Sequence, residues 1–252
     1  MRNVAHISSS RTIGLALSGG SVRGLAHIGV IKALAEAQIQ PRFIAGTSAG
    51  SIIGAALAAG MNWQDIAQMA RSVFWPALLN GQRLERFCAE HLPESFAELR
   101  LPFTAIATDL HSKRPVTLYE GRLATAISAS CAMRVIRRCV IHKGQRLKDG
   151  GITCVLPTVA CREMGAEFVI ASDVWELSSI LRSAGFHTAH PRGERLYPSH
   201  YREAVRHSDL LVTPSIPKSG YLPGVRAVDL MIEAGERATH KALARLTDQP
   251  AS

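Results

Sequence analysis

Residues 44–60 read IAGTSAGSIIGAALAAG, a strand–turn–helix pattern with a serine on the turn. A short apolar run ends in a glycine-bounded turn, and a helix of small apolar residues is expected from Ala49 to Ala59. The turn, Gly46-Thr47-Ser48-Ala49-Gly50, has the spacing GxSxG between a strand and a helix. A serine on such a turn sits in a strained backbone with its hydroxyl exposed, while the small neighbours let strand and helix approach. The stretch predicts an α/β fold with Ser48 as a nucleophile.

A membrane span is the alternative interpretation of this region. No charged residue falls between Arg42 and Asp65, which is long enough to cross a bilayer on length alone. A buried strand followed by a buried helix gives the same hydropathy, and the glycines, serines and turn chemistry favour it. The start, MRNVAHISSSRTIG, has no apolar run after its arginines. We therefore expect no secretory signal and a cytoplasmic protein.

Length and composition favour one large α/β domain. The chain has 252 residues, of which 47% are hydrophobic and 19% charged. We expect the domain to span residues 11–247, between polar tails at 1–10 and 248–252. The five cysteines are an odd number, and no CxxC pair or Cys/His spacing suggests a zinc site, so we expect reduced thiols. We expect no cofactor.

Apolar periodicity outside the opening stretch alternates between strands and helices. Strands are expected at 13–18, 41–46, 103–110, 115–119, 167–174 and 209–216, with shorter ones around Val140 and Leu147. Helices are expected at 25–37, 63–73, 84–91, 122–132, 156–164, 201–206 and 225–246. The alternation implies a three-layer fold, a mainly parallel central sheet between helices. Apart from the helix at 201–206, we interpret the polar, basic and irregular stretch 176–208 as a lid or surface excursion.

A glycine-rich loop follows the first expected strand and opens the first expected helix. It reads Gly19-Gly20-Ser21-Val22-Arg23-Gly24. Glycines let backbone N–H groups converge into a nest for negative charge, which the oxyanion of ester hydrolysis requires. A dinucleotide-binding loop is the alternative, but the spacing is not GxGxxG. Arg23 either binds an anion or, as we favour, braces the loop.

A third element, Asp149-Gly150-Gly151, follows the short strand around Leu147. Asp-Gly is a common turn pair, so the tripeptide alone predicts only a turn. Together with the glycine nest and the serine turn it forms an ordered set. An aspartate in such a set is a candidate base for the serine.

Three blocks of the sequence resemble the signature regions of bacterial patatin-like phospholipases. They are LALSGGSVRGLAHIGVIKAL at 15–34, IAGTSAGSIIGAALAAG at 44–60 and LKDGGITCVLPTVACREMGAEFVIASDV at 147–174. The resemblance implies a patatin-like fold and hydrolysis of acyl esters of phospholipids, lysophospholipids or neutral lipids without a metal. It also implies a Ser48–Asp149 dyad without histidine, and an oxyanion hole supplied by residues 19–24.

The chain departs from the family pattern in three places. Ser21 replaces the third glycine of GGGxRG, and its Cβ narrows the pocket while its N–H still donates. Residues 132–138, AMRVIRR, replace a stretch that contains proline and phenylalanine beside the site. Residues 153–157, TCVLP, replace an asparagine-rich approach to the Leu-Pro pair. These departures put pocket shape and the backbone support of Asp149 in question, and with them the level of activity.

Two alternatives to an active dyad remain open. A histidine after Asp149 would give the chain order Ser, Asp, His, and the candidates are His187, His190, His200 and His207. His27, on the first helix, is interpreted as a packing residue. A second alternative keeps the fold as a regulatory or binding module with a weak or silent site.

The net charge of +9 is unevenly distributed. Basic residues gather in two segments: Arg134, Arg137, Arg138, Lys143, Arg146 and Lys148 before the aspartate, and Arg182, Arg192, Arg195, Arg202 and Arg206 in the lid segment. The first group is interpreted as a solvated hairpin or as a steering patch for anionic headgroups. If both groups meet on one face, peripheral contact with an anionic membrane is expected. No recognised module or aromatic platform favours nucleic acid, and the oligomeric state stays open.

Overall fold

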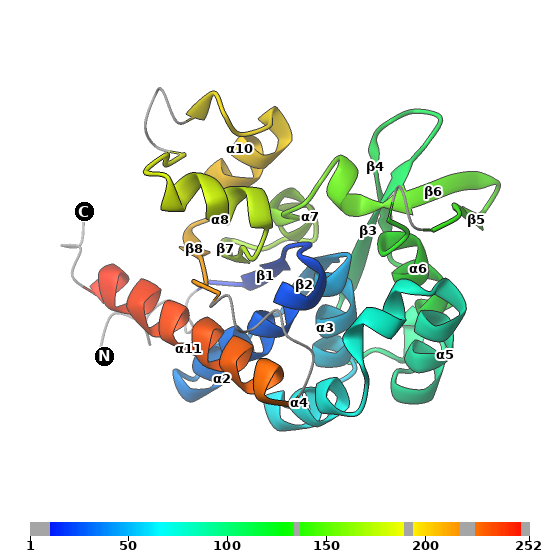
Figure 1. Ribbon diagram of the computed structural model, residues 1–252, viewed down its shortest axis with the longest axis horizontal. Helices are drawn as coiled ribbons and strands as arrows, with labels where there is room; N and C mark the ends of the chain where they lie inside the picture. Colours follow the sequence, from blue (N-terminus) through cyan, green and yellow to red (C-terminus); the bar gives the residue numbers. More distant parts are fainter. Residues whose placement is uncertain (1–10, 134–136, 189–193, 217–224, 248–252) are drawn as a thin grey trace.

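A computed structural model describes residues 11–133, 137–188, 194–216 and 225–247 of the chain. An eight-stranded sheet runs through the molecule in the order β5-β6-β3-β2-β1-β7-β8, with β4 paired to β3 off this path (Figure 1). Its strands are β1 (Ile13–Leu17), β2 (Phe43–Thr47), β3 (Phe103–Asp109), β4 (Pro115–Leu118), β5 (Val140–His142), β6 (Gln145–Asp149), β7 (Phe168–Ser172) and β8 (Leu210–Val212). Parallel pairing joins β3, β2, β1, β7 and β8 in that order along the sheet, whereas β4, β5 and β6 pair antiparallel. The expected mainly parallel sheet is confirmed.

Helices cover both faces of the sheet (Figure 1). They are α2 (Ala26–Glu36), α3 (Ala49–Ala58), α4 (Trp63–Arg71), α5 (Gly81–His91), α6 (Leu123–Ser130), α7 (Thr158–Glu163), α8 (Glu176–Ser183), α10 (Ser199–Arg206) and α11 (Val225–Thr247). Short 3-10 turns connect them: η1 (Ser21–Leu25), η2 (Trp75–Leu79), η3 (Phe96–Glu98) and η4 (Gly150–Ile152).

Side-chain alternation along the strands sorts the core into two layers. Leu15, Leu17 and Ile44 point into the larger core, which α2 to α6 and α11 complete. Ala16 and Ala45 point to the opposite face and pack near α7. Because successive strand residues face opposite sides, one sheet supplies apolar side chains to the helices on both of its faces. The three-layer fold is confirmed.

The longest helix of the described chain, α11, lies directly against α2. A Cβ atom added to Gly29 would lie 1.8 Å from the carbonyl oxygen of Ile232, and one added to Gly235 would lie 1.9 Å from that of Ala26. The two glycines thus allow the helix backbones to touch. This contact places the C-terminal helix across the N-terminal third of the fold (Figure 1).

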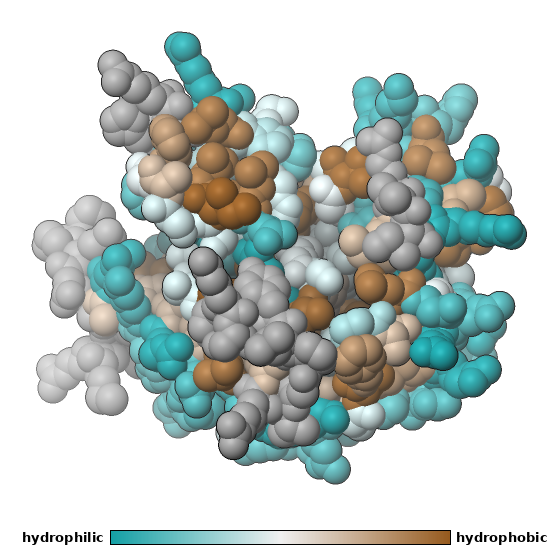
Figure 2. Space-filling view, in the orientation of Figure 1, coloured by the Kyte–Doolittle hydropathy of each residue, from teal (hydrophilic) through white to brown (hydrophobic). Residues whose placement is uncertain are grey.

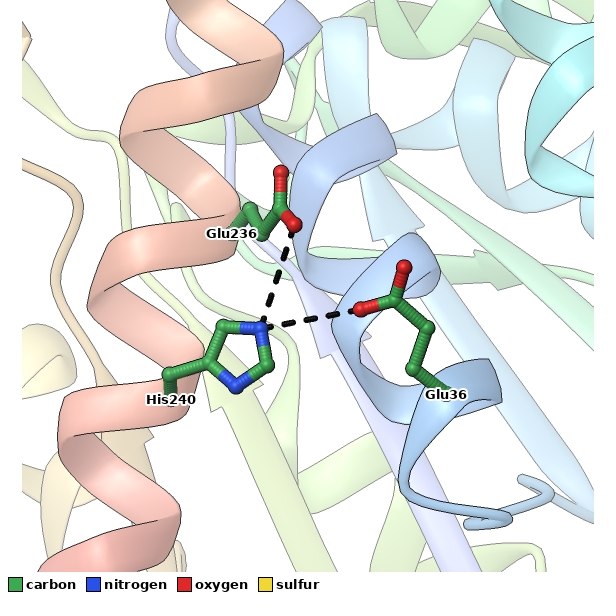
Figure 3. Close-up of side chains that lie close together, drawn as sticks. All are labelled: Glu36, Glu236 and His240. Atoms are coloured by element: carbon green, nitrogen blue, oxygen red, sulfur yellow. Dashed lines mark ion pairs between the residues drawn. The ribbon is translucent and has the colours of Figure 1, made fainter.

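Charged side chains close the outer edge of the α2–α11 contact. His240 Nε2 lies 3.6 Å from a carboxylate oxygen of Glu36 and 3.9 Å from one of Glu236 (Figure 3). Lys32 donates a 2.8 Å hydrogen bond to Glu236 and lies 3.8 Å from Glu36. The lysine ammonium gives these carboxylates a positive partner, so the cluster acts as an ion-pair network between the two helices.

The lid segment contains more regular structure than its sequence predicts. Residues 176–183 form α8, where an irregular excursion was expected, whereas the expected helix near 201–206 is present as α10. Leu181 of α8 packs against the core, whereas Leu177 and Ile180 are exposed, so α8 lacks the broad buried apolar face that identifies a core-facing helix. The strand expected over 209–216 ends at Val212. The expected tails at 1–10 and 248–252 lie outside the described residues.

The region without charges, 43–64, folds as β2 and α3 and enters α4. In the part of the chain that the structure describes, no helix is both long enough and apolar enough to cross a membrane. The carboxyl ends of β1, β2 and β7 meet at one edge of the sheet. Two lobes stand at this edge, one carrying α8 and α10 and the other β4 to β6 (Figure 1).

Candidate active site

Ser48 occupies the turn between β2 and α3 in a conformation that few non-glycine residues adopt. Its backbone angles are φ 52° and ψ −122°. A Cβ on Gly46 would lie 2.4 Å from the carbonyl oxygen of Gly50, and one on Gly50 would lie 2.3 Å from that of Leu17. The Ser48 N–H donates a 2.8 Å hydrogen bond to Ser130 Oγ. The small residues predicted at this turn are therefore required by the close approach of strand and helix.

The Ser48 hydroxyl points at the predicted base. Ser48 Oγ donates a 3.0 Å hydrogen bond to Asp149 Oδ2, and Asp149 Oδ1 accepts a 2.8 Å hydrogen bond from the Gly151 N–H. Asp149 ends β6 opposite Ala107 of β3. Its carbonyl oxygen accepts a 2.8 Å hydrogen bond from Thr108 Oγ1. Two residues 101 positions apart are thus joined side chain to side chain.

The surroundings of Asp149 favour proton uptake. Burial raises the pKa of its carboxyl group, and the hydrogen bonds from Gly151 and Ser48 and the charge of Arg137 oppose that shift only in part. Gly150 permits this burial, since a Cβ there would lie 2.3 Å from the carbonyl oxygen of Ile106. A carboxylate with a raised pKa and a serine hydroxyl in contact is a chemically suitable base for that serine.

The glycine loop offers fewer free amides than the sequence predicts. The Gly19 N–H donates 2.9 Å to the Val155 carbonyl oxygen, and the Arg23 N–H donates 3.1 Å to that of Gly20. The expectation that all six residues of 19–24 supply donors is therefore wrong for these two amides, because backbone pairing consumes them. Within the described chain, the N–H groups of Gly20, Ser21 and Val22 have no acceptor. Ser21 has φ 54°, the left-handed conformation that favours glycine.

Arg23 and Gly24 support the loop from below. The Arg23 side chain is buried, and its Nη1 lies 3.7 Å from Glu176 Oε1 at the start of α8. A Cβ on Gly24 would lie 2.5 Å from that of Ala49, so the loop packs against the first residue of α3. The bracing interpretation of Arg23 agrees with this geometry.

Residues 153–157 tie the parts of the site together. Thr47 Oγ1 donates 2.9 Å to the Cys154 carbonyl oxygen, while the Val155 carbonyl accepts from the glycine loop. Thr153 Oγ1 lies 2.8 Å from Thr108 Oγ1, which in turn donates to the Asp149 backbone. Although this segment departs from the family pattern, it does provide backbone support for Asp149. Sequence reasoning missed Thr108 and Ser130, and no local motif marks either.

The histidines of the described chain do not complete a triad. The carboxylate of Asp149 hydrogen-bonds to Ser48 and Gly151, and His187, His200 and His207 bond to neither partner of the dyad. His190 lies outside the described residues. His27 is fully buried, its Nε2 2.9 Å from the Ser18 carbonyl oxygen and its Nδ1 2.7 Å from Ser172 Oγ.

Burial lowers the pKa of His27 to about 4, so its imidazole is neutral near pH 7. The carbonyl of Ser18 can only accept, which places the proton on Nε2 and makes Nδ1 the acceptor for Ser172. His27 is a packing residue beneath the glycine loop, as interpreted from the sequence.

Part of the basic cluster before Asp149 turns inward. Arg137 donates 3.0 Å to the Cys131 carbonyl oxygen and 2.7 Å to Ser128 Oγ, and Lys148 is buried with its ammonium on the Arg137 carbonyl. The interpretation of both as solvated or headgroup-steering residues is wrong, because their side chains satisfy backbone and hydroxyl groups of the lobe. Arg138 and Arg146 are exposed as expected. Residues 134–136 lie outside the described chain.

Two hollows meet at Ser48. One holds about 120 Å³ and is almost entirely apolar; it is lined by Ser21, Val22, Ser48, Ala49, Ile52, Trp75, Pro76, Leu78, Leu79, Leu84, Cys131 and Met133. The other is a groove of about 260 Å³ lined by Gly19, Gly20, Ser21, Ser48, Met133, Asp149, Gly151, Ile152, Val155 and Trp175. The dyad therefore lies at the junction of an apolar pocket and a more open groove.

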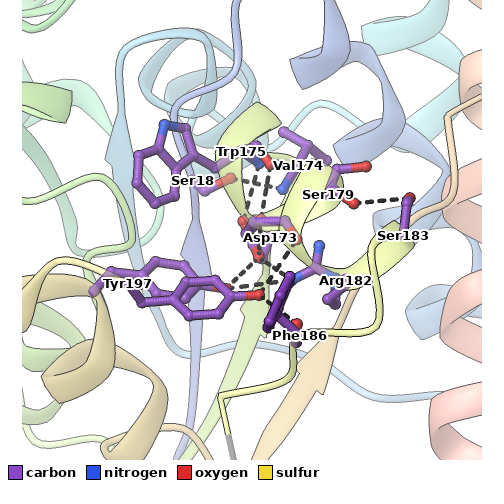
Figure 4. A network of polar contacts seen from close by, with 11 residues as sticks. Ser18, Asp173, Val174, Trp175, Ser179, Arg182, Ser183, Phe186 and Tyr197 are labelled. Carbon is purple, nitrogen blue, oxygen red and sulfur yellow. Dashed lines mark hydrogen bonds and ion pairs between the residues drawn. The ribbon is translucent and has the colours of Figure 1, made fainter. Parts of the chain in front are cut away.

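A buried carboxylate fastens the lobe of α8 and α10 beside the groove (Figure 4). Asp173, directly after β7, accepts hydrogen bonds from Ser178 Oγ at 2.7 Å, Arg182 Nη1 at 2.9 Å and the Tyr201 hydroxyl at 2.6 Å. Its other oxygen accepts from the Trp175 N–H at 2.9 Å. Asp173 thus organises the wall of the groove without contacting the dyad.

A comparison with known protein families agrees with the fold. The sequence profile of the patatin-like phospholipases matches residues 15–161, more than half of the chain. The chain belongs to the patatin-like phospholipase family.

Two relatives illustrate the breadth of the similarity. An NTE family protein of Mycobacterium tuberculosis is 33% identical over 178 residues, covering 65% of this chain and 49% of the relative. Patatin-like phospholipase domain-containing protein 6 of Homo sapiens is 33% identical over 190 residues, covering 68% of this chain and 14% of the relative. The chain therefore spans about half, or less, of the length of these relatives.

Solved structures share the fold at low sequence identity. VipD from Legionella pneumophila matches with a TM-score of 0.58 and 15% identity, covering 94% of this chain and 68% of that chain. The type III effector protein ExoU matches with a TM-score of 0.53 and 14% identity, covering 96% of this chain and 55% of that chain. The patatin-like architecture thus extends beyond the segment that the sequence profile matches.

Proposed function

We propose that this protein is a lipid acyl hydrolase that cleaves carboxylic esters of phospholipids or lysophospholipids through a Ser48–Asp149 dyad. The observation that carries the proposal is the 3.0 Å hydrogen bond from Ser48 Oγ to Asp149 Oδ2, on the strained turn of a patatin-like fold. Family membership supports a lipid ester as the substrate.

In this mechanism Asp149 takes the hydroxyl proton as Ser48 Oγ attacks the ester carbonyl carbon. The carbonyl oxygen becomes an oxyanion, and the N–H groups of Gly20, Ser21 and Val22 are the available donors for it. Each such donor contributes about 3 kcal/mol in the transition state. When the tetrahedral intermediate collapses, the carbon–oxygen ester bond breaks and the leaving alcohol takes the proton from Asp149. Water, activated by the same carboxylate, then hydrolyses the acyl-enzyme and regenerates Ser48.

The two hollows divide the substrate between them in this proposal. The apolar pocket under η2 suits the acyl chain, because burial of each methylene contributes about 0.8 kcal/mol. The open groove past Asp149 and Trp175 suits the leaving alcohol with its headgroup. Ser48 lies where the scissile carbonyl would join the two.

The test is hydrolysis of p-nitrophenyl butyrate and of a mixed-micelle phospholipid by wild type, Ser48→Ala and Asp149→Asn. Asp149→Asn keeps an acceptor oxygen for the Gly151 N–H and places an amide N–H group against Ser48 Oγ, so the base is removed with little change of shape. Each substitution is expected to lower kcat at least about 1,000-fold, because a nucleophile and its base act as a unit.

Ser72→Ala and Asp229→Asn are matched controls, since Ser72 caps the end of α4 and Asp229 pairs with Arg71 on the surface. Both are expected to hydrolyse at the wild-type rate. If Ser48→Ala retains full activity, the dyad is not the catalytic site. If wild type and controls alike release no product from either substrate, the fold serves as a binding or regulatory module.

A further inference from the structure

Helix α8 exposes large apolar side chains where an ordinary surface helix would expose polar ones. Its inward side carries Ser178 and Arg182, whose side chains are bound to the buried carboxylate of Asp173 (Figure 4), and Leu181, which packs against the core. Its outward face carries Leu177 and Ile180, three positions apart and 36% and 57% exposed. A soluble helix normally shows the opposite arrangement, with apolar residues inward.

The exposed apolar face continues past the end of the helix. Ala184 and Phe186 are exposed, Phe186 by 39%. We call Leu177, Ile180, Ala184 and Phe186 the α8 face. Figure 2 shows hydrophobic residues gathered over α8, beside the hollow between the two lobes. An apolar patch of this kind on a soluble protein marks an interaction site.

The α8 face adjoins the mouth of the active-site groove. Trp175, the residue that precedes α8, lines the groove with Ser48 and Asp149. Ile152, 38% exposed, lines the same groove. Arg182 Nη1 donates a 2.9 Å hydrogen bond to Asp173 Oδ2, which anchors α8 to the end of β7. The apolar face therefore lies on an anchored helix.

We propose that the α8 face is the surface on which this protein docks onto a lipid bilayer, with Leu177, Ile180 and Phe186 inserted among the acyl chains. The inference rests on the proposed function, since a bilayer is where the lipid substrate is found. Docking by this face brings the mouth of the groove to the lipid surface. Insertion of apolar side chains, aided by attraction between basic residues and anionic lipid, is the general mode of interfacial binding. The chain as a whole carries a net charge of +9, which adds such attraction.

The test uses the full chain with Leu177, Ile180 and Phe186 changed together to serine. Co-sedimentation is measured with vesicles of phosphatidylcholine, with and without phosphatidylglycerol. The triple variant is expected to bind at least about tenfold more weakly to both vesicle types, because several buried apolar groups are lost. Tyr119→Ser is the matched control. The Tyr119 side chain, just after β4, is 62% exposed and lines a different hollow, near the start of β3. This variant is expected to bind as wild type does.

Hydrolysis of soluble p-nitrophenyl butyrate separates this inference from the proposed function. The triple variant is expected to match wild type on the soluble ester and to lose at least about tenfold on vesicle phospholipid. Equal vesicle binding by the triple variant and the wild type would overturn the inference. So would a wild type that binds no vesicles and forms a dimer that the triple substitution dissociates. If vesicle binding depends on the α8 face but no ester is hydrolysed, docking stands and the proposed function fails.

Discussion

The carboxylate of Asp149 touches the Ser48 hydroxyl directly, so the proton affinity of this one group limits the proposed reaction. Burial raises its pKa, and the positive charge of Arg137 offsets part of that rise. The base acts only when it is deprotonated. Activity is therefore expected to rise with pH through the folded pKa of Asp149, and the acidic limb of the kcat/KM profile should lie above the ordinary carboxyl range.

Arg137→Gln tests this assignment. Removal of the charge leaves desolvation less opposed, so the pKa of Asp149 rises and the acidic limb of kcat/KM moves to higher pH. Arg138→Gln is the matched control, because Arg138 is the next residue along the chain and its side chain is exposed. The measurement is the pH profile of p-nitrophenyl butyrate hydrolysis, with thermal unfolding to check that both variants fold. An acidic limb at the same pH in both variants would contradict the assignment.

At the residue scale, the sequence predicts what depends on neighbours along the chain. Ser48 and its glycines follow from a strained turn between a strand and a helix, and the φ of 52° agrees. Asp149 follows only from the family resemblance, since an Asp-Gly pair alone predicts a turn. Ser130 supports Ser48 from 82 positions away, and a contact of that range leaves no local pattern.

At the scale of elements, the strand–turn–helix unit of β2 and α3 depends on the absence of side chains at its crossing. Gly50→Ala should gain helix propensity worth about 1 kcal/mol. The added Cβ, however, meets the Leu17 carbonyl oxygen at 2.3 Å, a clash with rigid backbone. Overpacking costs about 1–3 kcal/mol. The clash is expected to win, lowering both the free energy of unfolding and the ester hydrolysis rate.

Gly19→Ala provides the comparison for Gly50→Ala. A Cβ on Gly19 has its nearest neighbour, Ser48 Cβ, at an ordinary 3.5 Å. Urea unfolding should place this variant within about 0.5 kcal/mol of wild type. Equal stability of the two alanine variants would show that the crossing is looser than the structure has it.

The helix α8 shows where periodicity fails as a predictor of elements. Hydrophobic periodicity identifies a helix by the apolar face that it buries, and α8 buries Ser178 and Arg182 against Asp173 beside a partly buried Leu181. The helix α2, which has an ordinary apolar face, was expected at 25–37 and spans Ala26–Glu36, within the usual uncertainty of helix limits. The helix α5 begins at Gly81, earlier than the expected 84. The missed helix is the one whose outward face we assign to lipid.

At the scale of the whole molecule, the C-terminal helix closes the fold by docking on α2. Gly235→Ala places a Cβ 1.9 Å from the Ala26 carbonyl oxygen, so the two helices must separate. We expect a loss of at least about 1–3 kcal/mol in the free energy of unfolding. Lys241→Ala, at an exposed position of the same helix, should change it by less than about 0.5 kcal/mol. Urea unfolding of both variants measures the difference, and equal values would refute the tight contact.

The layered α/β architecture was predictable from the alternation of apolar strands and amphipathic helices. The antiparallel arrangement of β4 to β6 was not, because strand order is set by pairing between distant segments. The same holds for the meeting of β6 with the carboxyl ends of β2 and β3, which brings Asp149 to Ser48. Topology thus completes the site that local motifs only outline.

The most direct test of the Ser48–Asp149 dyad is covalent labelling by a fluorophosphonate, read by intact mass and by peptide mapping. We expect a single label on Ser48 in wild type, none in Ser48→Ala, and labelling slowed at least about 100-fold in Asp149→Asn, since the reaction needs the same base. An unlabelled wild type, or a label on any other residue, would contradict the dyad.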